Sequence, residues 1–315
     1  MLDKRIYMQI RIFSFHRVIK EDDELWQPLY PSNFARILKY IVANYKVVDL
    51  DKFLLSPNPE PAHKPYAGIT FDDGYKDILT NAFPLLKEYG IPFNMFVVTN
   101  CIETGLPPWT YILDYIFAHS SLLTNDAIDI MPPEFKVAKW ATKEDRILYA
   151  KRLKPFLKEC ANSYREKAVA AYVQNFKDVT VPRDLILNWD EVNYLSDQGV
   201  NIGSHSHTHP LLGKIELESS IYKEFKTSYD LLSQKIGKAP VSISYPVGSV
   251  DERAKRIAKE VGYKIGFAVN EQQYDSTQQD IFEIPRIELY NESMIKTKLR
   301  ANGFIQNIKK YIYLK

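Results

Sequence analysis

Two adjacent carboxylates stand at the end of an apolar run in the first third of the chain. The segment Gly68-Ile69-Thr70-Phe71 leads directly into Asp72, Asp73 and Gly74. Neighbouring side chains on a strand point to opposite faces, so the two carboxylates share a site only if the chain bends, and Gly74 permits that bend. Barrels and open α/β sheets place their reactive groups at such strand ends. The simpler interpretation is a solvated Asp-Asp-Gly turn after a core strand.

Three histidines gather after a second short strand pattern. His205, His207 and His209 fall within five residues. An extended segment would place all three on one face and a helical turn only His205 and His209, so in either case these two can reach one metal ion. The cluster favours metal binding over the core or solvated role expected of a single histidine. Catalytic zinc takes three protein ligands and keeps an open position, so an Asp from another strand end would complete the set.

Strand and helix patterns alternate along most of the chain. Strands are predicted at about 6–12, 47–50, 66–71, 93–98, 200–204, 241–245, 263–269 and 282–287. Ser32 is expected to cap the first helix, and the proline-rich stretch 56–61 to form a loop. This order predicts parallel strands with crossover helices. We therefore expect a single α/β domain over residues 1–315, a distorted (β/α)7-like barrel.

The stretch 103–184 interrupts this alternation. It is rich in Lys, Glu, Ala, Leu and Tyr at helical spacing. We interpret it as a helical insertion at the C-terminal face of the barrel, where such folds carry functional loops. Trp109, at its start, either lies near the mouth of the site and contacts substrate or anchors the insertion to the barrel. The tail 296–315 is expected to pack on the barrel as a terminal helix rather than lie on a membrane surface.

Composition limits the classes of partner. Forty-one basic and 39 acidic residues give a net charge of +2, which offers no basis for nucleic acid as a partner. Cys101 and Cys160 are the only cysteines, so neither a disulfide framework nor a thiolate zinc site is expected. No stretch approaches the ~18 apolar residues of a membrane span, and the charged, alternating start of the chain is unlike a signal peptide. A protein without a transmembrane segment, working in the cytoplasm, is expected.

Taken together, these motifs resemble a known family. Thr70-Phe71-Asp72-Asp73-Gly74 and His205-Ser206-His207-Thr208-His209 look like the first two motifs of the polysaccharide deacetylases, carbohydrate esterase family 4 with the NodB homology domain. Gly90-Ile91-Pro92 is similar to the family's Gly-Ile-Pro, and Phe15-His16-Arg17-Val18 resembles the Tyr-His-Arg-Val start of a bacterial subset. The resemblance covers nearly the whole chain except the insertion.

The resemblance implies a role for each motif residue. Asp73, His205 and His209 would hold a divalent metal, with zinc the expected ion, and Asp72 would be the general base. The backbone N–H of Val247 would stabilise the oxyanion, and Tyr245, in the same third motif, would lie at the substrate. His207 would be a spare imidazole, beside the ligands or in solvent.

Two departures from the family pattern shift roles to other residues. The third motif, Arg-x-Pro-Tyr in the family, reads Ser244-Tyr245-Pro246-Val247 here, so its arginine is absent. Arg286 is the expected replacement partner for Asp72. No histidine follows Phe282, where the family places its catalytic acid. The Tyr-His-Arg-Val subset resembles a circular permutation that supplies the acid from the first strand, so His16 is the expected acid; the alternative is a histidine hydrogen-bonded beneath the loop.

The expected function is metal-dependent removal of an N-acetyl group from a sugar or polysaccharide precursor. The expected substrates are an N-acetylated sugar, a nucleotide-sugar, a lipid-linked sugar or an oligosaccharide. One alternative is a deacylase or deformylase acting on another amide, since the same metal and base would serve it. The other is a carbohydrate-binding barrel with weak or no turnover, which the two missing family residues would explain.

Overall fold

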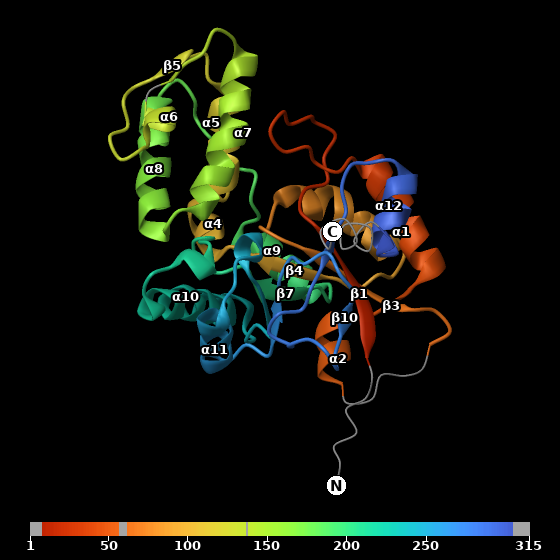
Figure 1. Ribbon diagram of the computed structural model, residues 1–315. Coiled ribbons are helices and arrows are strands. Elements are labelled where there is room, and N and C mark those ends of the chain that lie inside the picture. The colour runs from red at the N-terminus through yellow and green to blue at the C-terminus, as the bar shows by residue number, and fades with distance from the viewer. Residues whose placement is uncertain (1–7, 57–61, 137, 305–315) are drawn as a thin grey trace, which may run out of the picture.

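Parallel strands run through the centre of the molecule (Figure 1). The computed structural model describes residues 8–56, 62–136 and 138–304. Within these ranges the main sheet has the order β10-β1-β3-β4-β7-β8-β9, and only β10 is antiparallel to its neighbour. The strands are β1 (Gln9–Phe15), β3 (Tyr66–Phe71), β4 (Asn94–Val97), β7 (Asn201–Ser204), β8 (Ser242–Ser244), β9 (Ile265–Phe267) and β10 (Tyr274–Asp275).

A late segment closes the sheet into a ring. After β9 the chain returns so that Ile284 pairs with Phe267, and β11 (Ile287–Glu288) then pairs with β1 in parallel. The segment from Ile284 to Glu288 thus occupies the seventh position, between β9 and β1. The prediction of a distorted (β/α)7-like barrel is confirmed.

Helices cover the outside of this barrel. They are α1 (Pro31–Asn44), α3 (Phe83–Glu88) after a π turn at Ile78–Ala82, α9 (Trp189–Asp197), α10 (Glu218–Ile236), α11 (Glu252–Val261) and α12 (Met294–Ala301). Local signals set their ends: Asn188 and Glu191 form a capping box that starts α9, and left-handed Gly237 ends α10. Their apolar faces pack on the strands, where side chains such as Phe15, Phe34 and Phe71 are fully enclosed.

The first third of the chain departs from expectation in two places. Helix α1 starts at Pro31, whose missing N–H suits a first turn, so Ser32 lies inside the helix and is not its cap. The predicted second strand is only Lys46–Val47 (β2), and Asp49 caps a short helix α2 (Leu50–Leu55) that the sequence pattern did not reveal. The predicted first strand is β1, beginning at Gln9. Residues 1–7, 57–61 and 305–315, with parts of the predicted strand, loop and tail, lie outside the described residues.

A group of helices stands beside the barrel between β4 and α9 (Figure 1). It consists of α4 (Thr99–Thr104), α5 (Trp109–His119), α6 (Pro133–Lys136), α7 (Lys143–Glu159), α8 (Asn162–Asn175) and a hairpin of β5 (Thr124–Asn125) with β6 (Ala138–Lys139). The aromatic side chains of Phe117, Tyr149, Tyr172 and Phe176 centre a separate hydrophobic cluster. This cluster supports the interpretation of 103–184 as an insertion, which stays a prediction. Across the described residues, no helix combines the length and apolar character needed to cross a bilayer.

Candidate active site

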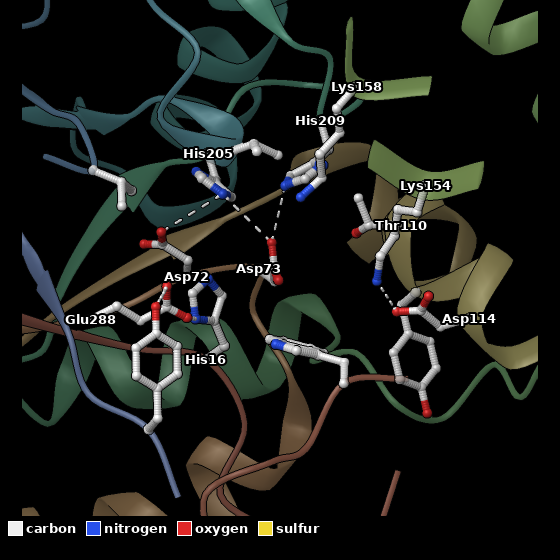
Figure 2. A pocket seen from close by; sticks show the side chains of 15 residues that line it. His16, Asp72, Asp73, Thr110, Asp114, Lys154, Lys158, His205, His209 and Glu288 are labelled. Atoms are coloured by element: carbon white, nitrogen blue, oxygen red, sulfur yellow. Dashed lines mark hydrogen bonds and ion pairs between the residues drawn. The ribbon is translucent and has the colours of Figure 1, made fainter. Parts of the chain in front are cut away.

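The chain bends sharply where β3 ends. Asp73 and Gly74 both adopt left-handed backbone conformations, with φ of 72° and 80°. A left-handed non-glycine residue is uncommon and marks a constrained position. The bend is therefore made by Asp73 as well as by Gly74. It brings the two carboxylates to the same cavity, with Asp72 and Asp73 facing different partners (Figure 2).

The histidine loop after β7 has a similar local character. Ser206 and His209 are left-handed, with φ of 64° and 60°, so the loop is neither a strand nor a helical turn. The Glu224 carboxylate on α10 accepts hydrogen bonds from the backbone N–H groups of His207 and Thr208, which fixes the outer part of the loop. His207 turns away, with its Nδ1 2.9 Å from Thr99 Oγ1. Only His205 and His209 of the triplet face Asp73.

Asp73, His205 and His209 form a set of convergent buried ligand atoms. Asp73 Oδ1 lies 3.3 Å from His209 Nε2 and 3.5 Å from His205 Nε2. Ligand atoms about 2.1 Å from a tetrahedral zinc ion stand about 3.4 Å apart, so this spacing fits such an ion. Asp73 Oδ1 is buried with no hydrogen-bond partner in the described residues. The donor set and this unsatisfied oxygen fit a divalent cation.

The electrostatic environment suits His205 as a ligand. Its Nδ1 lies 2.8 Å from the Ser244 carbonyl oxygen, which places the proton on Nδ1 and leaves the Nε2 lone pair toward Asp73. Burial lowers the pKa of His205 to about 4, against the opposing effect of Asp72. The imidazole is therefore neutral near pH 7, as a metal ligand must be.

Asp72 is engaged by a fully buried guanidinium. Arg286 Nη1 and Nη2 donate to the two Asp72 oxygens at 2.8 and 2.7 Å, a bidentate geometry. Arg286 also donates to Ser244 Oγ and Thr70 Oγ1 and is 0% exposed. Burial opposes the charge on Asp72, but Arg286 and then His205 outweigh it and hold the pKa of this carboxyl well below its ordinary value. Asp72 is therefore ionised at neutral pH.

His16 approaches the same cavity from the end of β1. Its Nδ1 lies 3.4 Å from Glu288 Oε1, and its ring packs edge-on against Trp26 with centroids 5.3 Å apart. The side chain is 24% exposed, so it contacts both protein and the open space. Figure 2 shows His16 beside Glu288 on the side of Asp72 that faces away from His209. A contact of this kind orients the imidazole within the cavity.

One cavity of about 330 Å³ joins these groups. Asp72, Asp73, His205, His209 and His16 all line it. Four of the five left-handed non-glycine residues among the described residues belong to the loops around it or to the adjoining turn at Val247. Such strain collects at functional sites, because the surrounding structure must over-determine it.

Comparison with known proteins identifies the family. The sequence model of the family described as polysaccharide deacetylase matches residues 60–266. The chain belongs to the polysaccharide deacetylase family. No curated protein matches the chain. The matched range contains Asp72, Asp73 and the histidine loop, and it leaves His16 and Arg286 outside.

Solved structures of deacetylases share the fold of the chain. The Streptococcus pyogenes deacetylase PplD in complex with acetate has a TM-score of 0.58 at 17% identity, covering 96% of this chain and 98% of the other. IcaB from Ammonifex degensii has a TM-score of 0.58 at 14% identity, covering 93% and 97%. A de-N-acetylase from Aggregatibacter actinomycetemcomitans has a TM-score of 0.56 at 16% identity, covering 92% and 99%. At these identities the likeness establishes the fold.

The turn after β8 contributes one residue, Val247, to the cavity wall. Val247 lines the cavity and is left-handed, with φ of 58°, which is strained for a β-branched residue. No acceptor among the described residues bonds the Val247 N–H. This free donor is what an oxyanion requires.

Two residues that were candidates for substrate contact, Tyr245 and Trp109, lie outside the cavity wall. The Tyr245 side chain is fully buried, and its hydroxyl donates to the Phe282 carbonyl, so this side chain does not reach the cavity. Trp109 is not part of the cavity wall; its indole N–H donates to the His209 carbonyl oxygen at 3.1 Å. Of the two alternatives for Trp109, the structure favours the anchor between the insertion and the histidine loop.

Several residues of the cavity wall carry no sequence motif. They are Trp26, Thr110, Tyr111, Asp114, Lys154, Lys158, Val269, Glu288 and Tyr290. Glu288 follows Arg286 by two residues. Side chains at this spacing on a strand point to the same face, so the sequence indicates that both face the inside of the barrel. Lys154 and Lys158 directly follow the buried residues Leu153 and Leu157 of α7. Their spacing of four residues indicates that both lie on the same side of the helix.

Proposed function

We propose that this deacetylase hydrolyses the N-acetyl amide of a sugar with the aid of a divalent cation held by Asp73, His205 and His209. The observation that carries the proposal is the convergence of three buried ligand atoms beside a separate, charge-paired carboxylate. Family membership supports a hydrolase acting on an acylated carbohydrate. The acetate complex of the similar Streptococcus pyogenes protein supports acetyl as the acyl group.

Each residue then has a distinct task. A bound cation would polarise the amide carbonyl and acidify a water molecule. Asp72, held in place by Arg286, accepts the proton of the attacking water. The Val247 N–H donates to the oxygen that becomes negative in the tetrahedral intermediate. His16, oriented by Glu288, donates a proton to the leaving sugar amine.

The test measures amine release from N-acetylated sugars by zinc- or cobalt-loaded protein. We expect Asp72→Asn and His16→Ala each to lower kcat by about 10²- to 10⁴-fold, while both variants bind as much metal as the parent protein. Exposed residues of the same types provide the controls, Asp197→Asn and His119→Ala, which should leave kcat unchanged. Release from a non-sugar amide alone would favour the deacylase alternative. Metal binding without hydrolysis of any amide would favour the binding barrel.

A further inference from the structure

One face of α7 directs two lysines toward the deacetylase cavity. Lys154 and Lys158 are four residues apart, so their side chains lie on the same side of the helix. Both line the cavity that holds Asp73 and His209. Figure 2 shows them extending from the insertion on the side opposite His16 and Glu288. The insertion thus supplies a cationic wall that faces the barrel residues.

The two lysines differ in what neutralises them. Lys154 forms an ion pair with Asp114 of α5, a carboxylate that is 2% exposed. Lys158 is half-buried, yet it has no hydrogen bond or ion pair with any residue in the described ranges. Burial, and then the neighbouring Lys154 ammonium, lower the pKa of Lys158; the Asp114 and Glu288 carboxylates oppose this shift without forming an ion pair with it. An ammonium that is partly removed from water and unpaired costs free energy, which a bound anion would offset.

The remaining charges of the cavity do not provide that anion. Asp72 is paired with Arg286, and Glu288 with His16. Asp73 faces the two imidazoles, and the proposed divalent cation would more than neutralise it. Lys158 is therefore the lysine of this wall that lacks a direct ion-pair partner among the described residues. Trp26 and Tyr290 line the same cavity beside His16 and Glu288, and they supply aromatic surface of the kind that packs on a sugar ring.

We propose that Lys158, with Lys154 beside it, binds an anionic substituent of the N-acyl sugar, a phosphoryl or carboxylate group. The substrate is then a charged sugar rather than a neutral one. The cavity volume of about 330 Å³ is at the lower end for ligand pockets and suits one sugar unit with its substituent. This inference rests on the proposed function, because the amide of the same sugar must reach Asp72.

The test is a set of calorimetric titrations of zinc-loaded protein with four probes. They are N-acetylglucosamine, its 1-phosphate, its 6-phosphate and N-acetylmuramic acid, which separate neutral, phosphoryl and carboxylate ligands. We expect at least one anionic probe to bind more tightly than the neutral sugar, and Lys158→Met to weaken that probe by at least about tenfold. Lys158→Arg should restore most of the affinity. Lys151→Met, at an exposed position of the same helix outside the cavity wall, should bind all four probes as the parent does.

Three outcomes would overturn the inference. Anionic probes bound no better than the neutral sugar would exclude an anion site. Anionic probes bound equally well by the parent and Lys158→Met would place the anion on the metal or elsewhere. A loss of kcat in Lys158→Met on a neutral substrate, with KM unchanged, would make Lys158 part of the reaction instead. The titrations need no turnover, so they give a result even if no amide is hydrolysed. Failure of the proposed function and failure of the anion site are therefore distinguishable.

Discussion

The barrel and the insertion both face the cavity, and they contribute to it in different ways. The barrel provides Asp72, Asp73, His205 and His209 from strand ends, all at most 5% exposed and fixed by backbone strain and hydrogen bonds. The insertion provides Lys158 from a helix face, half-buried and unpaired. The groups held by hydrogen bonds come from the barrel, and the group proposed to bind a ligand comes from the insertion. We infer that the barrel sets the reaction and the insertion selects the substrate.

The largest expected effect is in the barrel ligand set. His209→Ala removes one of three ligand atoms, so we expect loss of stoichiometric zinc and a fall of at least about 1,000-fold in kcat/KM. Zinc should also stop raising the midpoint of thermal unfolding, since that rise requires binding to the folded state. Metal analysis, kinetics and thermal scans check these outcomes.

His207→Ala is the matched control for this variant. Its imidazole contacts Thr99 and faces away from Asp73, so zinc content and activity should be kept. If His207→Ala lost zinc as completely as His209→Ala, the assignment of ligands within the triplet would be wrong.

The next effect concerns the buried ion pair of the barrel. Arg286→Met leaves Asp72 buried without its cation, and we expect a loss of about 3–5 kcal/mol in the free energy of unfolding, measured with urea at pH 7. The pair stabilises the parent above the ordinary Asp pKa of about 4, and this stabilisation is lost as the pH falls through the lower pKa of the folded state.

The same variant has a consequence for catalysis. Burial is already the largest single effect on Asp72, and loss of Arg286 removes the main effect that opposes it, so the pKa of Asp72 rises. The acidic limb of the kcat/KM profile should therefore move to higher pH. Arg256→Met, which removes an exposed guanidinium paired with Glu218, should change neither stability nor the profile appreciably. An unshifted acidic limb in Arg286→Met would contradict Asp72 as the base.

The smallest effect is at the joint between the two regions. Trp109→Phe keeps an aromatic ring but removes the hydrogen bond to the His209 carbonyl, worth about 1 kcal/mol. If the insertion helps to hold the histidine loop, zinc affinity should fall about fivefold in a competition titration with a chelator. Trp189→Phe removes an indole bond to Glu103 outside the cavity wall and should leave zinc affinity unchanged. Equal effects of the two variants would mean that the insertion does not support the metal ligands.

The sequence allowed the barrel and its principal site residues to be predicted for a physical reason. Short motifs at strand ends bring Asp72, Asp73, His205 and His209 to one edge of the sheet, because parallel strands all end there. The contact between Asp72 and Arg286 was predicted because the third-motif arginine of the family is absent here. The buried Asp72 carboxylate therefore needs another cation as its partner.

The rest could not be predicted in the same way. The residue types and spacing of 103–184 predicted helices, but the direction of Lys158 depends on how the insertion packs against the barrel. The direction of the Tyr245 side chain could have been inferred from the alternation of side chains along a strand. The Ser244 hydroxyl points inward to Asp72, so the next side chain must point outward.

The position of Arg286 in the chain has a consequence for the synthesis of the protein. Asp72 leaves the ribosome 214 residues before its partner does. Until Arg286 arrives, burying the Asp72 carboxylate would cost more than the nascent barrel gains, so we expect the gap between β1 and β9 to stay hydrated. Closure of the barrel and burial of the ionised Asp72 carboxylate would then occur together, late in synthesis. A fragment of residues 1–280 tests this, since it should lack a cooperative unfolding transition. Incomplete chains would accordingly be inactive, and an unfinished enzyme would not act on the sugars of the cell that makes it.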